Sequence, residues 1–126
     1  KMVVQAITIA EPLYDAYRSS VDFIQRYVFP GGALPTVEAM RASAARSGGL
    51  ALVGLEDITT HYVETLRRWR RNFHDNLHEV RALGYPERFV RMWDFYLGYC
   101  EGGFAERSIG DVQMVLARTS DGGARR

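Results

Sequence analysis

The chain has 126 residues, a length that supports one domain with one hydrophobic core. Hydrophobic residues make up 47% and charged residues 25%, which excludes a disordered chain, and a formal net charge of +1 gives no global field to attract nucleic acid. The single cysteine, Cys100, excludes an internal disulfide and a zinc site built from the cysteines of one chain. No apolar run approaches the roughly 20 residues of a membrane-spanning helix, and the first residues lack a signal-peptide pattern, so we expect a cytoplasmic protein.

The first predicted element is a strand over residues 2–9, MVVQAITI, a run rich in β-branched residues. It is apolar on both faces, which is typical of an interior strand of an α/β sheet. An interior strand needs a neighbour on each side. We therefore expect the chain to be a piece of a larger sheet.

A sharp corner is predicted at residues 30–32, Pro-Gly-Gly. Residues 11–28 carry apolar side chains at helical spacing and predict one or two short helices that end there, because proline fixes φ and glycine adopts positive φ without steric cost. Tyr27 and Phe29 stand beside the corner, so each is held in a set direction. This arrangement suits either a packed corner or the wall of an apolar pocket.

The remaining elements alternate between helix and strand. We predict a helix over 37–46 capped by Thr36, a strand over 50–57, a helix over 61–83 capped by Thr59 or Thr60, a helix from Pro86 to Arg107, and a strand over 109–118. Alternation of this kind predicts an α/β fold. The last eight residues, 119–126, are predicted to be a disordered tail.

Few residue clusters in the sequence point to chemistry. His74 and His78 are four apart, a spacing that can bring two imidazoles to one metal ion, but the HExxH order is missing and exposed helix histidines are the favoured interpretation. Cys100 shares a helical stripe with Tyr96 and Phe104, which favours a buried small hydrophobe over a nucleophile. No metal site is predicted.

Two further features have a functional and a structural interpretation. The arginines of LRRWRRNF form either the solvated face of a helix or a patch for anionic phospholipid headgroups; they are Arg67, Arg68, Arg70 and Arg71. Tyr62 follows a strand at the first turn of a helix, where backbone N–H groups and a phenol can hold a small anion. The alternative for Tyr62 is an anchor in the core.

The segments VDFIQRYVFPGGALPT, HYVETLRRWRRNF and ERFVRMWDFYLGYCEGGFAERSIGDVQMVLAR together resemble the C-terminal half of the cyclopropane-fatty-acyl-phospholipid synthases. The resemblance covers residues 2–118, in the family's order and spacing. It implies that residues 1–118 are the lipid-substrate half of a class I methyltransferase domain with a Rossmann-like fold. The chain would then form a three-stranded mixed sheet with several helices, and its last strand would be antiparallel and lie between the other two.

The resemblance also implies a reaction. The family transfers a methyl group from S-adenosylmethionine to the cis double bond of a phospholipid acyl chain, and a bound bicarbonate removes a proton. The sequence contains no glycine-rich phosphate or dinucleotide loop. We therefore expect this chain alone to lack the cofactor site, and to be inactive without an N-terminal half.

Three positions match the family's bicarbonate site, and five match its apolar acyl channel. Tyr62 corresponds to the tyrosine, Ile7 supplies a backbone amide, and Gln5 stands where the better-known members have histidine. A glutamine amide donates a hydrogen bond but carries no proton away, so the expected product is a cyclopropane ring or a methylated or methylenated chain. The residues expected to bind the acyl chain are Tyr27, Phe29, Tyr96, Cys100 and Phe104.

The expected partner is an unsaturated phospholipid at the inner face of the membrane, where the protein would bind peripherally. Nucleic acid is not expected as a partner. An alternative from another class is a non-catalytic half-domain that acts as a binding or assembly module. Such a module would pair with a missing N-terminal half, or with a second copy through its first strand.

Overall fold

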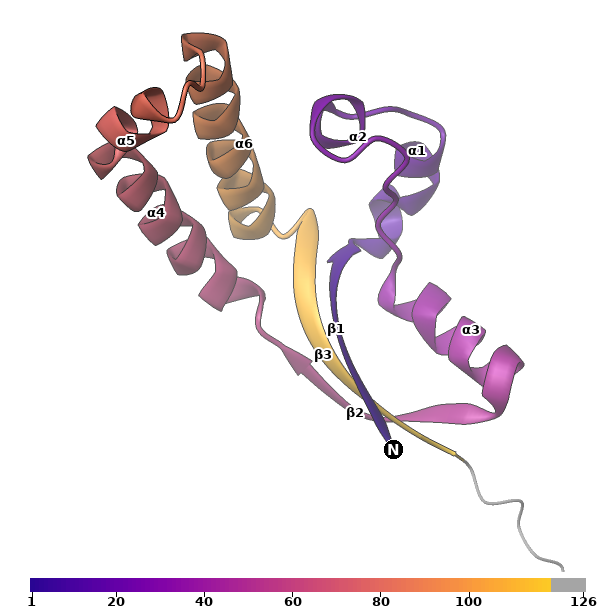
Figure 1. Ribbon diagram of the computed structural model, residues 1–126. Coiled ribbons are helices and arrows are strands. Elements are labelled where there is room, and N and C mark those ends of the chain that lie inside the picture. Colours follow the sequence, from indigo (N-terminus) through magenta and orange to yellow (C-terminus); the bar gives the residue numbers. More distant parts are fainter. Residues whose placement is uncertain (119–126) are drawn as a thin grey trace, which may run out of the picture.

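The computed structural model describes residues 1–118, which form a three-stranded sheet with helices on both faces (Figure 1). The strands are β1 (Met2–Ile9), β2 (Leu50–Asp57) and β3 (Ile109–Arg118), each over the range predicted from the sequence. Their order is β1-β3-β2, and β3 is antiparallel to both neighbours. The α/β fold class and the central antiparallel last strand are thus confirmed. The strands β1 and β2 run in the same direction on either side of β3.

Two hydrophobic clusters cover the two faces of β3. On one face Val112, Met114 and Leu116 are buried against the helix α3 (Val37–Gly48). On the other side the helices α4 (Thr59–Asp75) and α6 (Glu87–Ala105) pack against each other around a cluster that also contacts Ile109. The alternation predicted for the last strand is confirmed, since successive side chains reach different layers.

The helix predicted over residues 61–83 is interrupted. The helix α4 ends at Asp75, and α5 (Leu77–Ala82) follows after Asn76. The Asn76 side chain donates a hydrogen bond to the Asn72 carbonyl at 2.8 Å, which competes with the regular backbone ladder. The longest helix is therefore α6, with 19 residues.

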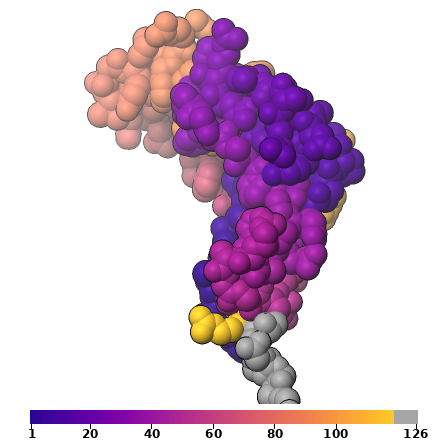
Figure 2. All heavy atoms as spheres, turned by 90° about the vertical axis from the view of Figure 1, so that its right-hand side faces the viewer, coloured from indigo at the N-terminus to yellow at the C-terminus, as the bar shows by residue number. Residues whose placement is uncertain are grey.

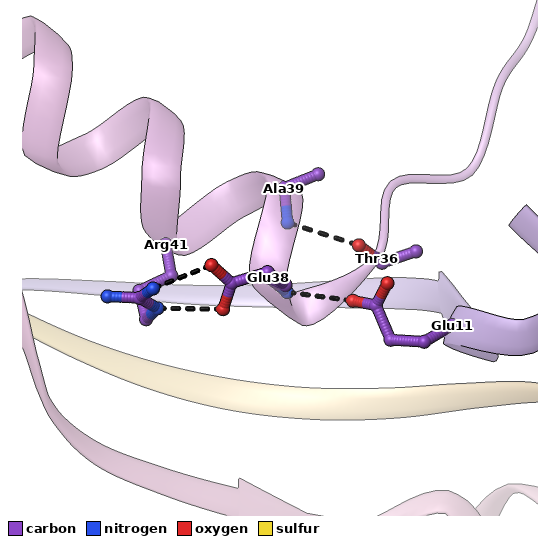
Figure 3. Close-up of polar contacts among 5 residues, drawn as sticks. All are labelled: Glu11, Thr36, Glu38, Ala39 and Arg41. Carbon is purple, nitrogen blue, oxygen red and sulfur yellow. Dashed lines mark hydrogen bonds and ion pairs between the residues drawn. The ribbon is translucent and has the colours of Figure 1, made fainter.

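Of the two N-terminal helix caps predicted from the sequence, one is confirmed and one is wrong. Thr36 Oγ1 accepts a hydrogen bond from the Ala39 amide at 3.1 Å and caps α3 as predicted (Figure 3). The Glu38 amide in the same first turn donates to Glu11 at 3.3 Å. The cap predicted at Thr59 or Thr60 is wrong, because Thr59 is the first residue of α4 and its amide donates instead to Asp57 Oδ1 at 2.9 Å.

The segment between β1 and α3 forms a layer over one end of the sheet. It contains a 3₁₀ turn at Glu11–Leu13 and the short helices α1 (Tyr14–Arg18) and α2 (Phe23–Tyr27). Figure 2 shows this segment as a continuous mass above α3. The predicted corner follows α2, with Gly31 at a φ of 81° and the Gly32 amide donating to the Phe29 carbonyl at 3.0 Å.

The first strand is an edge strand of the described sheet. Its free side has no partner strand within residues 1–118, where Val3 is 68% exposed and Ile7 is 39% exposed, and the neighbour expected on that side stays a prediction. The tail predicted for residues 119–126 lies outside the described residues. Within residues 1–118, no helix combines the length and the apolar character needed to cross a membrane.

Candidate functional site

A polar cluster joins β1 and β3 on one face of the sheet. The strand register sets Gln5 opposite Gln113 and Ile7 opposite Asp111. Gln5 Nε2 donates a hydrogen bond to Asp111 Oδ2 at 3.2 Å, and Gln113 Nε2 donates to Gln5 Oε1 at 3.1 Å. The Gln5 amide is therefore held from both sides and directed at a carboxylate.

The carboxylate of Asp111 is the most deeply buried charged group of the described residues. Asp111 is 1% exposed, its amide donates to Thr59 Oγ1 at 3.1 Å, and its carbonyl accepts from the Ile58 amide at 2.9 Å. Its second carboxylate oxygen, Oδ1, is buried and accepts no hydrogen bond of standard geometry from residues 1–118. Burial raises the pKa of Asp111, and interactions with Gln5 and Tyr62 offset part of that rise.

Tyr62 completes the cluster from the first turn of α4. Its ring packs on Phe104 with the centroids 5.1 Å apart. Burial raises the pKa of Tyr62, its charge and hydrogen-bond interactions with the Asp111 carboxylate raise it further, and its interaction with Gln5 lowers it in part. The structure thus brings Tyr62 and Gln5 together, as the resemblance implies, and adds Asp111.

An apolar cavity of about 260 Å³ opens beside this cluster. Five of the residues singled out from the sequence line it: Ile7, Phe29, Tyr96, Cys100 and Phe104. The corner after α2 is fixed as one wall, because Gln25 Nε2 donates to the Gly32 carbonyl at 3.0 Å and the Leu34 amide donates to the Tyr17 hydroxyl at 3.0 Å. The corner therefore serves as a pocket wall.

Tyr27 does not line this cavity. Its ring is 57% exposed and borders a separate groove of about 810 Å³ next to Phe23 and Phe95. Phe29 lies two residues further on and turns inward, with its ring 6.4 Å from that of Tyr96. The corner thus directs its two aromatic neighbours to different sides.

The surroundings of Cys100, His74 and His78 favour a structural role for each over a catalytic or metal-binding one. Cys100 is 7% exposed, and burial raises the pKa of its thiol to about 11, so the thiolate that a nucleophile requires is scarce at neutral pH. His74 Nε2 lies 2.6 Å from Asp94 Oδ1, a carboxylate that Arg70 also binds. His78 is exposed, and residues 1–118 contain no group of three metal-ligating side chains.

Asp111 is the functional candidate that the sequence interpretation missed. In the segment SIGDVQMVLAR, Asp111 is the one acidic residue of a predicted strand. Its partner Gln5 is 106 residues away along the chain, so only the strand pairing reveals the contact. A lone aspartate on an otherwise apolar strand was the available signal.

Residues 1–114 match the protein family described as mycolic acid cyclopropane synthetase. The chain belongs to this family. It is 38% identical, over 93% of its own length, to the tuberculostearic acid methyltransferase UfaA1 of Mycobacterium tuberculosis, and 33% identical, over 82%, to the cyclopropane-fatty-acyl-phospholipid synthase of Escherichia coli K12. These matches span 27% and 26% of the two relatives, so the chain covers about a quarter of their length.

Solved structures show the same fold. The crystal structure of the mycolic acid cyclopropane synthase CmaA1, complexed with SAH and CTAB, superposes with a TM-score of 0.78 at 23% identity. The superposition covers 91% of this chain and 43% of that one. The family model thus confirms the expected family, and the superposition confirms the expected fold for this part of it.

Proposed function

We propose that the natural full-length protein transfers a methyl group from S-adenosylmethionine to the cis double bond of an unsaturated phospholipid acyl chain. The observation that carries this proposal is the apolar cavity beside the polar cluster of Gln5, Tyr62 and the buried Asp111. An alkene that gains a methyl cation needs an apolar site for its chain and a base where positive charge develops. The cavity and the cluster meet these two needs side by side. The names of the relatives support the same class of substrate.

The cavity residues are proposed to hold the acyl chain. Phe29, Tyr96 and Phe104 supply aromatic walls, and Cys100 supplies a small apolar floor. Burial of apolar chain against such walls is worth about 25 cal/mol per Å², and the walls also keep water away from a reactive cation. Tyr27 is proposed to contact lipid at the outer groove instead.

S-adenosylmethionine is proposed to bind to residues outside this chain. The sequence carries no glycine-rich strand-to-helix loop, and the described cluster offers no other phosphate or nucleoside cradle. The cofactor would supply an electrophilic methyl group. Calorimetry should find weak or no binding of S-adenosylmethionine to the isolated chain, and tight binding would refute this part of the proposal.

The reaction is proposed to take place at the inner membrane surface. The arginines of α4 are less available for headgroups than their sequence suggests, because Arg67 binds Glu101 at 2.7 Å, Arg68 binds Glu64 at 2.8 Å, and Arg70 binds Asp94 at 2.7 Å. Charge reversal at Arg67, Arg68, Arg70 and Arg71 in the natural protein is expected to weaken binding to liposomes of anionic phospholipid. Unchanged binding would exclude these arginines from membrane contact.

A second candidate function is an assembly module. The exposed edge of β1, with Val3 68% exposed, favours pairing with another strand, either of an N-terminal half or of a second copy. Size-exclusion chromatography with light scattering should show a dimer of the isolated chain. A compact monomer would exclude self-pairing.

Methyl transfer itself is tested with methyl-labelled S-adenosylmethionine, the natural protein and vesicles of unsaturated phospholipid. Label in the extracted acyl chains supports the proposal, and saturated phospholipid is the matched control substrate. Label that is absent from both lipids would refute it.

A further inference from the structure

A wide groove lies between α2 and the start of α6, at the end of the molecule away from the N-terminus (Figure 1). It has a volume of about 810 Å³ and is lined by aromatic and other apolar side chains together with two arginines, Arg88 and Arg91. Phe95 is 54% exposed and Tyr85 is 48% exposed, so large rings face the open groove. Large exposed apolar patches of this kind mark interaction sites for proteins or membranes.

The rings that line the groove pack against one another. Phe23 of α2 meets Phe95 of α6 edge to face, with the ring centroids 4.8 Å apart. Tyr85, just before α6, stacks on Phe89 with the centroids 4.4 Å apart. Rings that are already ordered lose little conformational freedom when they meet an apolar surface, so the groove is prepared for binding.

The rim of the groove carries positive charge. Within residues 1–118, Arg88 and Arg91 of α6 form no ion pair. Glu87, the acidic residue next to Arg88, is bound by Arg81. Arg26 of α2 is exposed and belongs to no ion pair of the described residues either. The groove therefore combines apolar rings with arginines that can bind anions.

The groove and the apolar cavity share their two helices. The helix α2 contributes Phe23 to the groove and Ile24 to the cavity, and α6 contributes Phe95 to the groove and Tyr96 to the cavity. Successive residues of a helix point about 100° apart, so each helix has one side on the groove and another on the cavity. A surface held against the groove thus lies about 10 Å, one helix diameter, from the cavity.

We infer that this groove docks the protein on the surface of an anionic phospholipid bilayer, an inference that rests on the function proposed above. Aromatic rings settle at the boundary between headgroups and acyl chains, and arginines bind the headgroup phosphates. The lining comes from α2, α6 and the turn before α6, which separates the groove from the exposed edge of β1 proposed for assembly. Docking at the groove presents the acyl chains of the bilayer to the cavity.

The first test measures binding to vesicles by co-sedimentation at low salt, without S-adenosylmethionine. Vesicles of dioleoyl phosphatidylglycerol are compared with vesicles of dioleoyl phosphatidylcholine. One arginine at an anionic surface changes binding about fivefold, so the natural protein with both Arg88→Gln and Arg91→Gln should bind the phosphatidylglycerol vesicles about 25-fold more weakly. Arg46→Gln, an exposed arginine in the last turn of α3, is the control and should bind as the natural protein does. Equal binding by the double variant would overturn the inference.

A second readout reports which surface touches the bilayer. Phe95→Trp places an indole in the groove, and Val53→Trp, at a 58% exposed position of β2, places one outside it. Brominated acyl chains quench the fluorescence of an indole only at close range. We expect quenching in Phe95→Trp beyond that of the natural protein, and no added quenching in Val53→Trp. Phe95→Trp without added quenching would contradict docking through the groove.

The docking surface and the proposed function fail in different ways. Vesicle binding that depends on Arg88 and Arg91, without methyl transfer to the bound lipid, would refute the proposed function and support the docking surface. Methyl transfer and vesicle binding that both persist in the double variant would support the proposed function and overturn the docking surface. The groove would then be assigned to another partner, such as an acidic protein.

Discussion

Replacing Phe29 or Phe104 by alanine separates the wall of the cavity from the core beneath it. Phe104 is 3% exposed and belongs to the cluster between α4 and α6, so Phe104→Ala should lower the free energy of unfolding by about 3–5 kcal/mol. Phe29 is 57% exposed, so a little under half of its side chain is buried, and Phe29→Ala should cost only about 1 kcal/mol. Both side chains line the cavity.

Acyl binding should follow a different order from stability. Phe29→Ala removes an aromatic wall and should weaken the binding of a fluorescent cis-unsaturated phospholipid by about tenfold, which corresponds to about 1.4 kcal/mol. Urea unfolding and lipid titration of the natural protein and its variants give the two numbers, with Leu83→Ala, 77% exposed and outside the cavity lining, as the control. The reasoning is refuted if Phe29→Ala is as destabilising as Phe104→Ala, or if it binds the lipid as tightly as the natural protein.

Three further predictions concern stability and reactivity. Because burial raises the pKa of Asp111, folding favours its neutral form, and Asp111→Asn should raise the melting temperature at neutral pH, with a gain that disappears as the pH falls below about 4; a lower melting temperature at pH 7 would contradict this. Cys100, whose thiol has its pKa raised to about 11, should resist iodoacetamide at pH 8 in the folded protein and react after denaturation, as mass spectrometry can show. Gly103→Ala places a Cβ 3.1 Å from Ile109 and should destabilise α6 by about 1–3 kcal/mol, whereas Gly102→Ala meets nothing within 4 Å and should stabilise it by up to about 1 kcal/mol; equal effects in urea unfolding would refute the packing described.

The strands were predictable because each depends on local features that the sequence displays. The strands over residues 2–9 and 50–57 are short, β-branched apolar runs, and the last strand alternates with a period of two. Thr36 was predictable as a cap because a hydroxyl just before a helical pattern commonly accepts a hydrogen bond from a free amide of the first turn. That β3 lies between the other strands came from the family resemblance, since nothing in a single strand shows which neighbour it will have.

The predictions failed where a side chain can form hydrogen bonds of similar strength with more than one partner. Asn76 bonds to the backbone of its own helix and interrupts it, although the apolar stripe continues across that position. Thr59 was expected to cap a helix through its hydroxyl, but that hydroxyl accepts a hydrogen bond from the Asp111 amide of β3. Tyr27 and Phe29 border different hollows because α2 ends at Tyr27 and Phe29 lies beyond that end, a geometry that spacing alone does not give.

Two of the three residues of the polar cluster were predicted, and the third was not. Tyr62 and Gln5 came from the resemblance, and the structure brings them into one cluster. Asp111 depends on a pairing across 106 residues, and its significance comes from its burial, which the sequence does not display.

The most direct measurement is mass spectrometry of unsaturated phospholipid incubated with the natural protein and methyl-labelled S-adenosylmethionine. We predict that its acyl chains gain one labelled carbon, as a ring or as a methyl or methylene branch, and that saturated phospholipid gains none. Unsaturated acyl chains that stay unlabelled with the natural protein would contradict the proposed function.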